Sequence, residues 1–320
     1  MNNLKSRRAF IVGLSSTKIT NKERLFLRKY KPWGVILFAR NIKSVDQTKK
    51  LTNDIKKIFK DSKYPILIDE EGGMVTRIRS IIDNSHFPAK YFGDNYKKDK
   101  TKSLLYLRTY IKQISHLLRY MGISINTVPV LDIPRPFTSK VIGTRAISKD
   151  INVINKIGEK TIEHFKEARI ATVIKHIPGH GLAKSDSHLK LPIVDKTYEY
   201  LMKNDFKTFK NKKSLFAMTA HILFRKIDAN NPVTHSSKII GIIRKKLKFK
   251  NLIISDDISM KALKFNITLN TIKAFTAGCD LVLHCNGKIK EMTKVAENSK
   301  KLNKFIIEKT LKYYRLVGND

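Results

Sequence analysis

Residues 172–188 read TVIKHIPGHGLAKSDSH, a short apolar run that passes directly into a segment rich in histidine, lysine, aspartate and glycine. The run Thr172–Ile174 is apolar without alternation, which is typical of a parallel strand buried on both faces. Seven more runs of this kind occur, with longer segments of helical period between them: Ala9–Leu14, Gly34–Phe38, Pro65–Ile68, Ser124–Val128, Leu215–Thr219, Leu252–Ile254 and Leu281–Leu283.

The segments between these runs carry helix signals. Ser44, three residues before Gln47, is the start of a capping box and predicts a helix. Asp150 predicts the N-cap of another helix, and residues 101–121 form a helical stretch that stops at a glycine. The lysine-rich segment 95–102 predicts a surface loop.

Eight strand–helix units over about 290 residues are the number found in a closed (β/α)₈ barrel. A doubly wound open sheet is the competing arrangement. Its usual glycine-rich first turn is absent, because residues 13–16 read GLSS and match neither GxGxxG nor GxxxxGK[ST]. No change in composition marks a domain boundary. The sequence therefore predicts an α/β fold with a single (β/α)₈ barrel domain over residues 1–320.

Composition excludes several classes of protein. Hydrophobic residues make up 42% of the chain, enough for a substantial core and too many for wholesale disorder. No apolar run approaches the eighteen or so residues of a membrane span, and the apolar stretch 9–14 is short for a signal peptide. A strand between Cys279 and Cys285 would hold their thiols too far apart for a disulfide. We expect a cytoplasmic protein, without a membrane partner and monomeric.

The net charge of +37 raises the question of nucleic-acid binding. Lysine far outnumbers arginine, although arginine is the better residue for bidentate recognition of bases and phosphates. The lysines are spread over nearly every expected helix, without a basic tail or a stacked-aromatic RNA motif. We therefore expect a solvated basic surface and no specific nucleic-acid partner.

Polar residues concentrate after four of the apolar runs, where a barrel places its chemistry. They are Asp69–Glu71, the segment 175–188, His221 and Ser255–Asp257. Each has a simpler interpretation, since Asp256 or Asp257 could cap a helix near Met260, Arg77 could be a surface residue and the glycines could form turns. Four strand ends with ionisable groups together favour a site, because unpaired buried charges are costly.

Two chemistries suit these residues. Glycoside hydrolysis needs a nucleophile on one side of the scissile bond and a proton donor on the other. Metal-assisted hydrolysis would use His and Asp as ligands. Metallohydrolase barrels generally have a His-x-His pair on the first strand, and the first run here ends in Gly13-Leu14-Ser15, so we expect no metal and no cofactor.

Five segments resemble glycoside hydrolase family 3, and within it the single-domain bacterial β-N-acetylglucosaminidases of peptidoglycan recycling. They are IDEEGGMVTRI (68–78), VIGTRAIS (141–148), KHIPGHGLAKSDSH (175–188), MTAH (218–221) and IISDDISM (253–260). The pattern KH[FI]PGHGxxxxDSH is long and specific, and with the AGCDLVL run at 277–283 the resemblance covers roughly residues 9–285. It also implies a barrel.

The resemblance implies the role of each site residue. The nucleophile falls on Asp256, and the acid/base falls on His188, oriented and tuned by Asp186. A neutral imidazole avoids like-charge repulsion with the nucleophile. Substrate-binding roles fall on Asp69, Arg77, Arg145, Lys175 and His176.

The implied activity is retaining hydrolysis of terminal GlcNAc from muropeptides such as GlcNAc–1,6-anhydro-N-acetylmuramic acid. The alternatives are a phosphorylase on the same fold, since a histidine repels phosphate less than a carboxylate does, and a non-enzymatic sugar-binding relative. The sequence departs from the family pattern at three positions, with Glu70, Met74 and Ile147 in place of the usual Gln, Arg and Phe. These differences affect the expected contacts with the substrate and leave the expected reaction unchanged.

Overall fold

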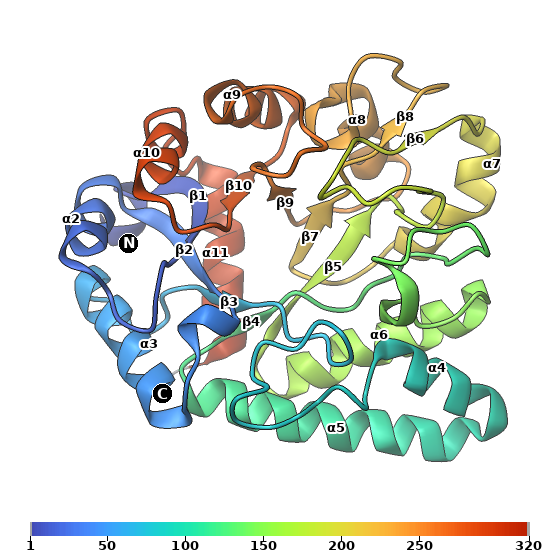
Figure 1. Cartoon of the computed structure of the whole chain (residues 1–320), viewed down its shortest axis with the longest axis horizontal. Helices are drawn as coiled ribbons and strands as arrows, with labels where there is room; N and C mark the ends of the chain where they lie inside the picture. The colour runs from blue at the N-terminus through green and yellow to red at the C-terminus, as the bar shows by residue number, and fades with distance from the viewer. Residues whose placement is uncertain (1, 319–320) are drawn as a thin grey trace.

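The computed structural model describes residues 2–318, and eight of their strands close into a barrel of parallel strands (Figure 1). The order around the barrel is β1-β10-β9-β7-β5-β4-β3-β2, so strands that follow one another along the chain are neighbours. Their bounds are β1 (Arg8–Gly13), β2 (Pro32–Leu37), β3 (Ile66–Ile68), β4 (Ile125–Asn126), β5 (Ala171–Ile177), β7 (Phe216–Thr219), β9 (Leu252–Asp257) and β10 (Leu281–His284). The predicted (β/α)₈ fold is confirmed, and each predicted run overlaps one of these strands.

Helices connect the strands and surround the barrel. Their bounds are α1 (Asn2–Lys5), α2 (Asn21–Tyr30), α3 (Val45–Phe59), α4 (Ala89–Lys98), α5 (Lys100–Tyr120), α6 (Ile151–Glu167), α7 (Tyr198–Lys203), α8 (Ser237–Lys245), α9 (Ile267–Ala277), α10 (Ile289–Glu297) and α11 (Lys304–Val317). Two short strands, β6 (Ile193–Val194) and β8 (Leu223–Phe224), pair above β5 and β7, in the loops that follow them. Within residues 2–318, no helix is long and apolar enough to cross a membrane.

The predicted helix starts are confirmed in their main features. The Ser44 hydroxyl accepts the backbone N–H of Gln47 at 3.3 Å, and the Asp150 carboxylate accepts an N–H in the first turn of α6. The Gln47 side chain accepts the N–H of Lys43 rather than that of Ser44, so the expected capping box is only half formed. Helix α5 ends just before Gly122, whose φ of +79° is the left-handed conformation that glycine adopts readily.

The predicted loop over residues 95–102 is wrong, because two helices meet there. Helix α4 runs to Lys98 and α5 begins at Lys100, so Asp99 alone joins them. Asp99 caps α5 by accepting the backbone N–H of Lys102 at 3.0 Å. The lysines lie on exposed turns of these helices. The buried residues Phe92 and Gly93, which pack α4, precede the segment in the sequence.

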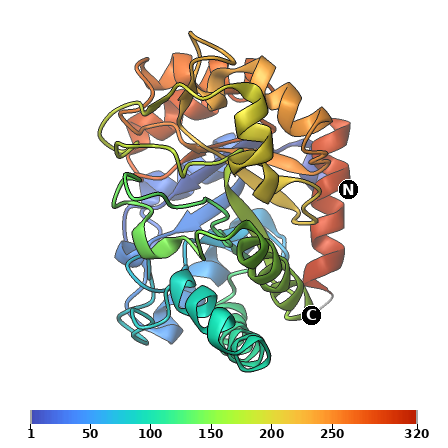
Figure 2. The same cartoon turned by 90° about the vertical axis from the view of Figure 1, so that its right-hand side faces the viewer.

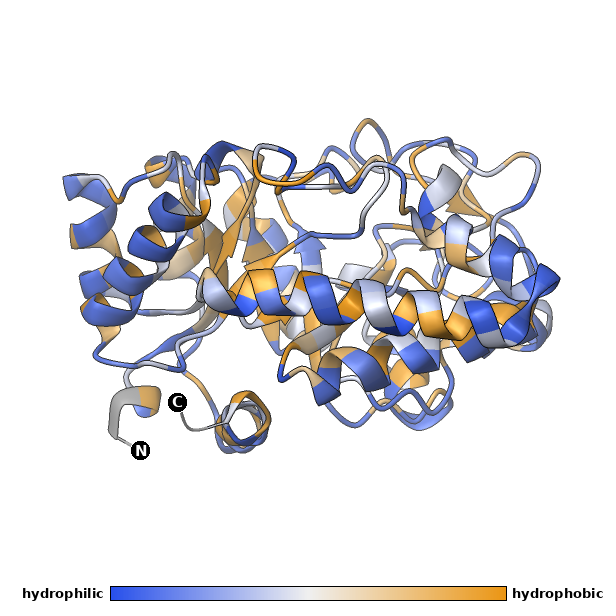
Figure 3. Ribbon diagram, turned by 90° about the horizontal axis from the view of Figure 1, so that it is seen from below, coloured by the Kyte–Doolittle hydropathy of each residue, from blue (hydrophilic) through white to orange (hydrophobic). Residues whose placement is uncertain are grey.

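The core has two layers. One lies between the strands and the surrounding helices, and the other fills the barrel and extends onto α11. Trp33 anchors α11 there, since its indole N–H donates to the Thr310 hydroxyl at 2.8 Å. Figure 2 shows α11 at one end of the barrel and the loops that follow the strands at the other. Figure 3 shows largely apolar strands inside and helices on which polar and apolar residues alternate. Helix α11 therefore lies across one end of the barrel interior, and the loop end is not covered by it.

Candidate active site

A cavity of about 200 Å³ lies at the loop end of the barrel, where the carboxyl ends of the strands converge. Asp186 is the only predicted site residue that does not line it. The predicted residues that line the cavity are Asp69, Arg77, Arg145, Lys175, His176, His188 and Asp256. The fold thus brings together side chains that are up to 187 positions apart in the sequence.

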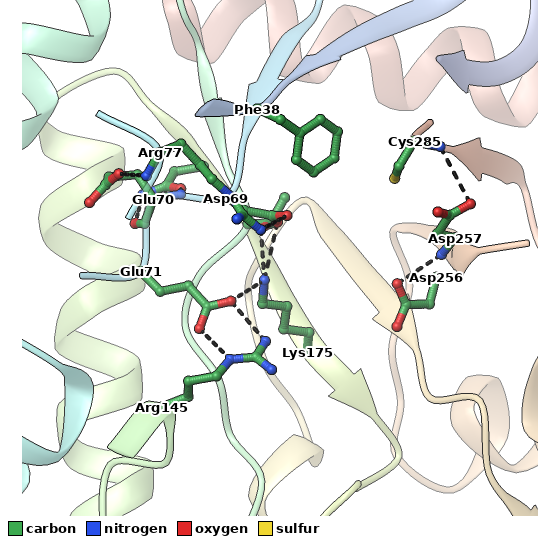
Figure 4. Close-up of polar contacts among 12 residues, drawn as sticks. Phe38, Asp69, Glu70, Glu71, Arg77, Arg145, Lys175, Asp256, Asp257 and Cys285 are labelled. Atoms are coloured by element: carbon green, nitrogen blue, oxygen red, sulfur yellow. Dashed lines mark hydrogen bonds and ion pairs between the residues drawn. The ribbon is translucent and has the colours of Figure 1, made fainter. Parts of the chain in front are cut away.

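Glu71 organises one wall of the cavity (Figure 4). Its two oxygens lie 2.7 and 2.9 Å from the Arg145 guanidinium, and one of them also lies 2.5 Å from Lys175 Nζ. All three side chains are buried. Burial alone would raise the pKa of Glu71, but Arg145 and Lys175 lower it to about 2. A fully paired, ionised carboxylate cannot donate a proton near neutral pH, so its role is to fix the two cations.

Asp69 extends this wall toward Arg77. One Asp69 oxygen lies 3.2 Å from Lys175 Nζ and accepts the Thr127 hydroxyl, and the other lies 3.3 Å from the Arg77 guanidinium. Burial would raise the pKa of Asp69, but Lys175 and Arg77 hold it well below its usual range. Asp69 is therefore an ionised acceptor at the cavity surface, suited to sugar hydroxyl groups.

The two aspartates at the end of β9 have different surroundings. Asp256 lines the cavity, and its carboxylate accepts the backbone N–H of Asp257 at 2.8 Å. The Asp257 carboxylate instead accepts the backbone N–H and hydroxyl of Ser259 and, at 3.4 Å, the N–H of Cys285. The interpretation of either as a cap near Met260 is wrong, because that segment is a turn and the next helix begins at Ile267.

Two buried histidines act electrostatically on Asp256. His176 is held by Asp132, which lies 2.7 Å from its Nδ1, and His221 Nε2 lies 3.0 Å from the Asp257 backbone oxygen. Burial would raise the pKa of Asp256, but His221, His176 and the Asp257 N–H together lower it. Asp256 is thus ionised at neutral pH, without a cation in direct contact within residues 2–318.

His188 stands at the mouth of the cavity with its side chain 59% exposed. Its Nδ1 lies 2.8 Å from Asp186, which also accepts its backbone N–H at 2.8 Å. Burial would raise the pKa of Asp186, but these hydrogen bonds from His188 lower it. The intervening Ser187 turns inward, 3.2 Å from His180 Nε2. The predicted pair therefore forms, and no residue between 2 and 318 hydrogen-bonds to Nε2 of His188.

Four residues of the site escaped the sequence interpretation as functional groups: Glu71, Thr127, Asp132 and His180. Asp132 accepts the backbone N–H groups of both His176 and His180, and so fixes the turn between β5 and the 186–188 segment. It follows the run Ser124–Val128, so the rule applied to the other strand ends would have found it. No comparable signal shows which cations Glu71 binds.

The three departures from the family pattern lie outside the set of paired charges. Glu70 accepts the backbone N–H of Arg77 at 2.7 Å and the Asn84 amide at 3.2 Å, so it secures the 69–84 loop. Its burial raises its pKa. Met74 is 61% exposed at the rim of the cavity, and Ile147 is buried against Gly93. Only Met74 is therefore placed to touch a bound molecule.

Glu71→Gln is expected to destabilise the protein by about 3–5 kcal/mol, because it leaves Arg145 and Lys175 buried without their carboxylate. The depressed pKa of Glu71 means that its stabilisation is present above about pH 4.5 and is lost as the pH falls toward 2. Urea unfolding at several pH values measures both effects. The assignment would be contradicted if the unfolding free energy of the variant fell between about pH 4.5 and pH 2 as it does in the wild type. Glu163→Gln, at an exposed position, is the control.

Comparisons with known proteins bear on this site. Residues 4–313 match the family described as the glycosyl hydrolase family 3 N-terminal domain. Proteins named β-hexosaminidase are similar: that of Methylobacillus flagellatus is 33% identical over 282 residues, which cover 86% of this chain and 80% of the relative. That of Idiomarina loihiensis is 31% identical over 287 residues, which cover 87% and 84%.

A solved structure is also similar to this chain. NagZ from Neisseria gonorrhoeae in complex with N-trifluoroacetyl-D-glucosamine superposes with a TM-score of 0.86 at 25% identity, covering 98% of this chain and 91% of that one. The family match spans nearly the whole sequence, and the barrel and its polar loop end agree with it. The chain belongs to glycoside hydrolase family 3.

Proposed function

We propose that this protein is a retaining, exo-acting β-N-acetylglucosaminidase that hydrolyses terminal GlcNAc from muropeptides such as GlcNAc–1,6-anhydro-N-acetylmuramic acid. One observation carries the proposal. Among the described residues, three carboxylates line the cavity, and Asp256 is the one without a cation within 4 Å. Asp69 and Glu71 are neutralised by their partners, so Asp256 is the carboxylate available for attack.

In the proposed reaction, an Asp256 oxygen attacks the anomeric carbon while the bond to the leaving oxygen breaks. His188 donates the proton that the leaving oxygen takes up. The result is a glycosyl ester on Asp256. His188, now neutral, then takes a proton from water, whose oxygen attacks the same carbon and releases Asp256. Two displacements return the original configuration.

His188 is the best-placed proton donor among the histidines at the cavity. His176 Nδ1 is held by Asp132, and His180 is fully buried with its Nε2 against Ser187. Burial lowers the pKa of His180 to about 4, so it is neutral at working pH. Among these three histidines His188 alone is exposed, and its Nδ1 lies 2.8 Å from Asp186.

Substrate selection follows from the shape and charge of the cavity. Its volume of about 200 Å³ falls below that of typical drug-sized pockets, which supports binding of a single terminal sugar. Asp69, Arg77, Arg145, Lys175 and His176 are proposed to hold its hydroxyl and acetamido groups. The bound N-trifluoroacetyl-D-glucosamine of the gonococcal relative supports an acetamido sugar. The basic surface suits the carboxylates of a muropeptide.

The two free thiols of the chain fit the cytoplasm, where we place the protein.

A panel of aryl β-glycosides tests the proposal. We expect hydrolysis of the N-acetylglucosaminide, little of the glucoside, and GlcNAc as product from the natural disaccharide. GlcNAc-1-phosphate formed in phosphate buffer would identify a phosphorylase instead. Binding without turnover of any glycoside would identify a sugar-binding relative.

Activity is expected to survive exhaustive chelation. The proposed chemistry uses only side chains, and residues 2–318 contain no group of three or more His, Cys, Asp and Glu arranged to hold a metal ion. The measurement is turnover of the aryl N-acetylglucosaminide after dialysis against EDTA, compared with a mock-dialysed sample. Loss of turnover that Zn²⁺ restores would make the histidines metal ligands.

A further inference from the structure

A second hollow opens at the opposite end of the barrel from the active-site cavity. Its volume is about 1110 Å³, and it is enclosed by α6, by α11 and by the segments that lead into β5, β7 and β9. Figure 2 shows α11 at this end. The hollow, which we name the basal cleft, shares no lining residue with the cavity around Asp256. A molecule bound in it would leave the active site open.

The basal cleft is the site of an unusual concentration of positive charge. Eight of its nineteen lining residues are Lys or Arg, against 64 of 320 in the whole chain, so the density is about doubled. They are Lys166, Lys212, Lys213, Lys248, Lys250, Lys309, Lys312 and Arg315. The high net charge of the protein therefore does not by itself account for the density of positive charge in the cleft.

The acidic residues of the cleft do not offset this charge. Glu159 lies 2.6 Å from Nζ of the buried Lys212, and Glu163 is paired at 2.8 Å with Lys160, which lies outside the cleft lining. Lys309 has only a 3.4 Å contact with its neighbour Glu308. The cations that form no ion pair with any described residue are Lys166, Lys213, Lys248, Lys250, Lys312 and Arg315.

Apolar side chains in the cleft strengthen the combined electrostatic field of these cations. They belong to the floor of the cleft and include Ile162, Ile170, Leu215 and Leu316. Low-dielectric walls around a concave group of like charges focus the electrostatic potential and attract counter-ions. The repulsion among the cations is relieved when an anion binds, so the folded protein gains stability from such a ligand.

The polar groups of the floor limit what is recognised. The Asn251 amide donates to the Ser214 backbone oxygen at 2.9 Å, and the Ser214 hydroxyl lies 2.9 Å from that of Thr172. These groups are already hydrogen-bonded to one another, so they are poorly suited to read a base or a sugar. Lysine ammonium groups act as point charges that suit phosphate without fixed geometry.

We propose that the basal cleft binds an anion that carries a chain of phosphate groups and is no larger than a nucleotide. The volume lies near the upper end of small-molecule pockets. Short inorganic polyphosphates such as tripolyphosphate, and nucleoside triphosphates, share this chemistry. The proposal does not depend on the proposed function, because the cleft and the catalytic residues lie at opposite ends of the barrel.

Isothermal titration with tripolyphosphate and with ATP, at physiological ionic strength, tests the proposal. The cleft variant combines Lys213→Gln, Lys250→Gln and Lys312→Gln. The matched control combines three exposed changes with the same loss of charge, on helices that do not line the cleft: Lys97→Gln, Lys98→Gln and Lys100→Gln. We expect binding to wild type and to the control, and a Kd raised about tenfold or more in the cleft variant.

The controls separate the possible results. Aryl-glycoside turnover should be unchanged in both variants and unaffected by either anion, so folding of the variants is checked independently. Tighter binding of ATP than of tripolyphosphate would point to nucleotides, and equal binding to the phosphate chain alone; both support the proposal. Equal weakening in the two variants, no binding to wild type, competition with the glycoside, or binding only of long single-stranded DNA would each overturn it.

Discussion

Turnover is expected to fall by roughly 10⁵-fold or more when Asp256 is replaced by Ala, the largest loss we expect from any single change in the protein. The reason is that Asp256 is the cavity carboxylate without a cation partner, so nothing described in the cavity can replace it as nucleophile. Sodium azide should enter the space of the missing carboxylate and restore activity on an activated aryl glycoside. The product should be the glycosyl azide of inverted configuration, which NMR identifies.

The wild-type enzyme gives a direct readout of the same residue. A 5-fluoro N-acetylglucosaminyl fluoride should slow both steps, so that the glycosyl ester accumulates, and peptide mass spectrometry should locate the sugar on Asp256. The control is Asp257→Asn, since Asp257 is engaged with Ser259 and the Cys285 backbone. We expect that variant to lose stability and to remain labelled. Sugar found on Asp257 or Glu71 would refute the assignment.

The second large effect is expected for His188→Ala, and its size should depend on the leaving group. An alkoxide cannot depart without a proton, so cleavage of a natural disaccharide should slow by about 10²–10⁴-fold. A dinitrophenolate needs little help, so its release should slow much less. Hydrolysis of the glycosyl ester would then limit turnover, and stopped-flow measurements should show a burst of phenolate that azide converts to fast turnover.

Asp186→Asn should give a milder form of this pattern, because the imidazole remains and only its 2.8 Å partner changes. His180→Asn serves as a comparison, since it disturbs the contact with Ser187 but leaves the proposed proton donor in place. Equal rate losses on good and poor leaving groups in His188→Ala would reduce His188 to a binding residue.

The barrel could be predicted from the sequence because its strands are buried on both faces. Most of these strands therefore include a continuous apolar run, and Thr172–Ile174 is one that can be recognised without knowledge of the neighbouring strands. The segment 95–102 could not be assigned in the same way. Its lysines lie on the solvent side of two helices, and the packing that holds those helices involves Phe92 and Gly93, outside the segment.

Some residues of the site could likewise be predicted from the sequence, and others could not. Lys175 and Asp256 could be found because polar groups at the ends of apolar strands are costly unless they have a use. The role of Glu71 could not, because its partners are 74 and 104 positions away, and only the closed barrel selects Arg145 and Lys175 among 64 cations. Pairing at long range depends on the fold and leaves no local pattern.

Closure of the barrel has a consequence for synthesis on the ribosome. Strand β1 pairs with β10, as Phe10 with Val282, so its edge remains unsatisfied until nearly the whole chain has emerged. Exposed parallel edges of this kind promote association between unfinished chains. The basic residues are spread along the sequence, so the part of the chain that has emerged already carries a net positive charge, and unfinished chains repel one another. This repulsion opposes association between chains at a stage when the barrel is incomplete.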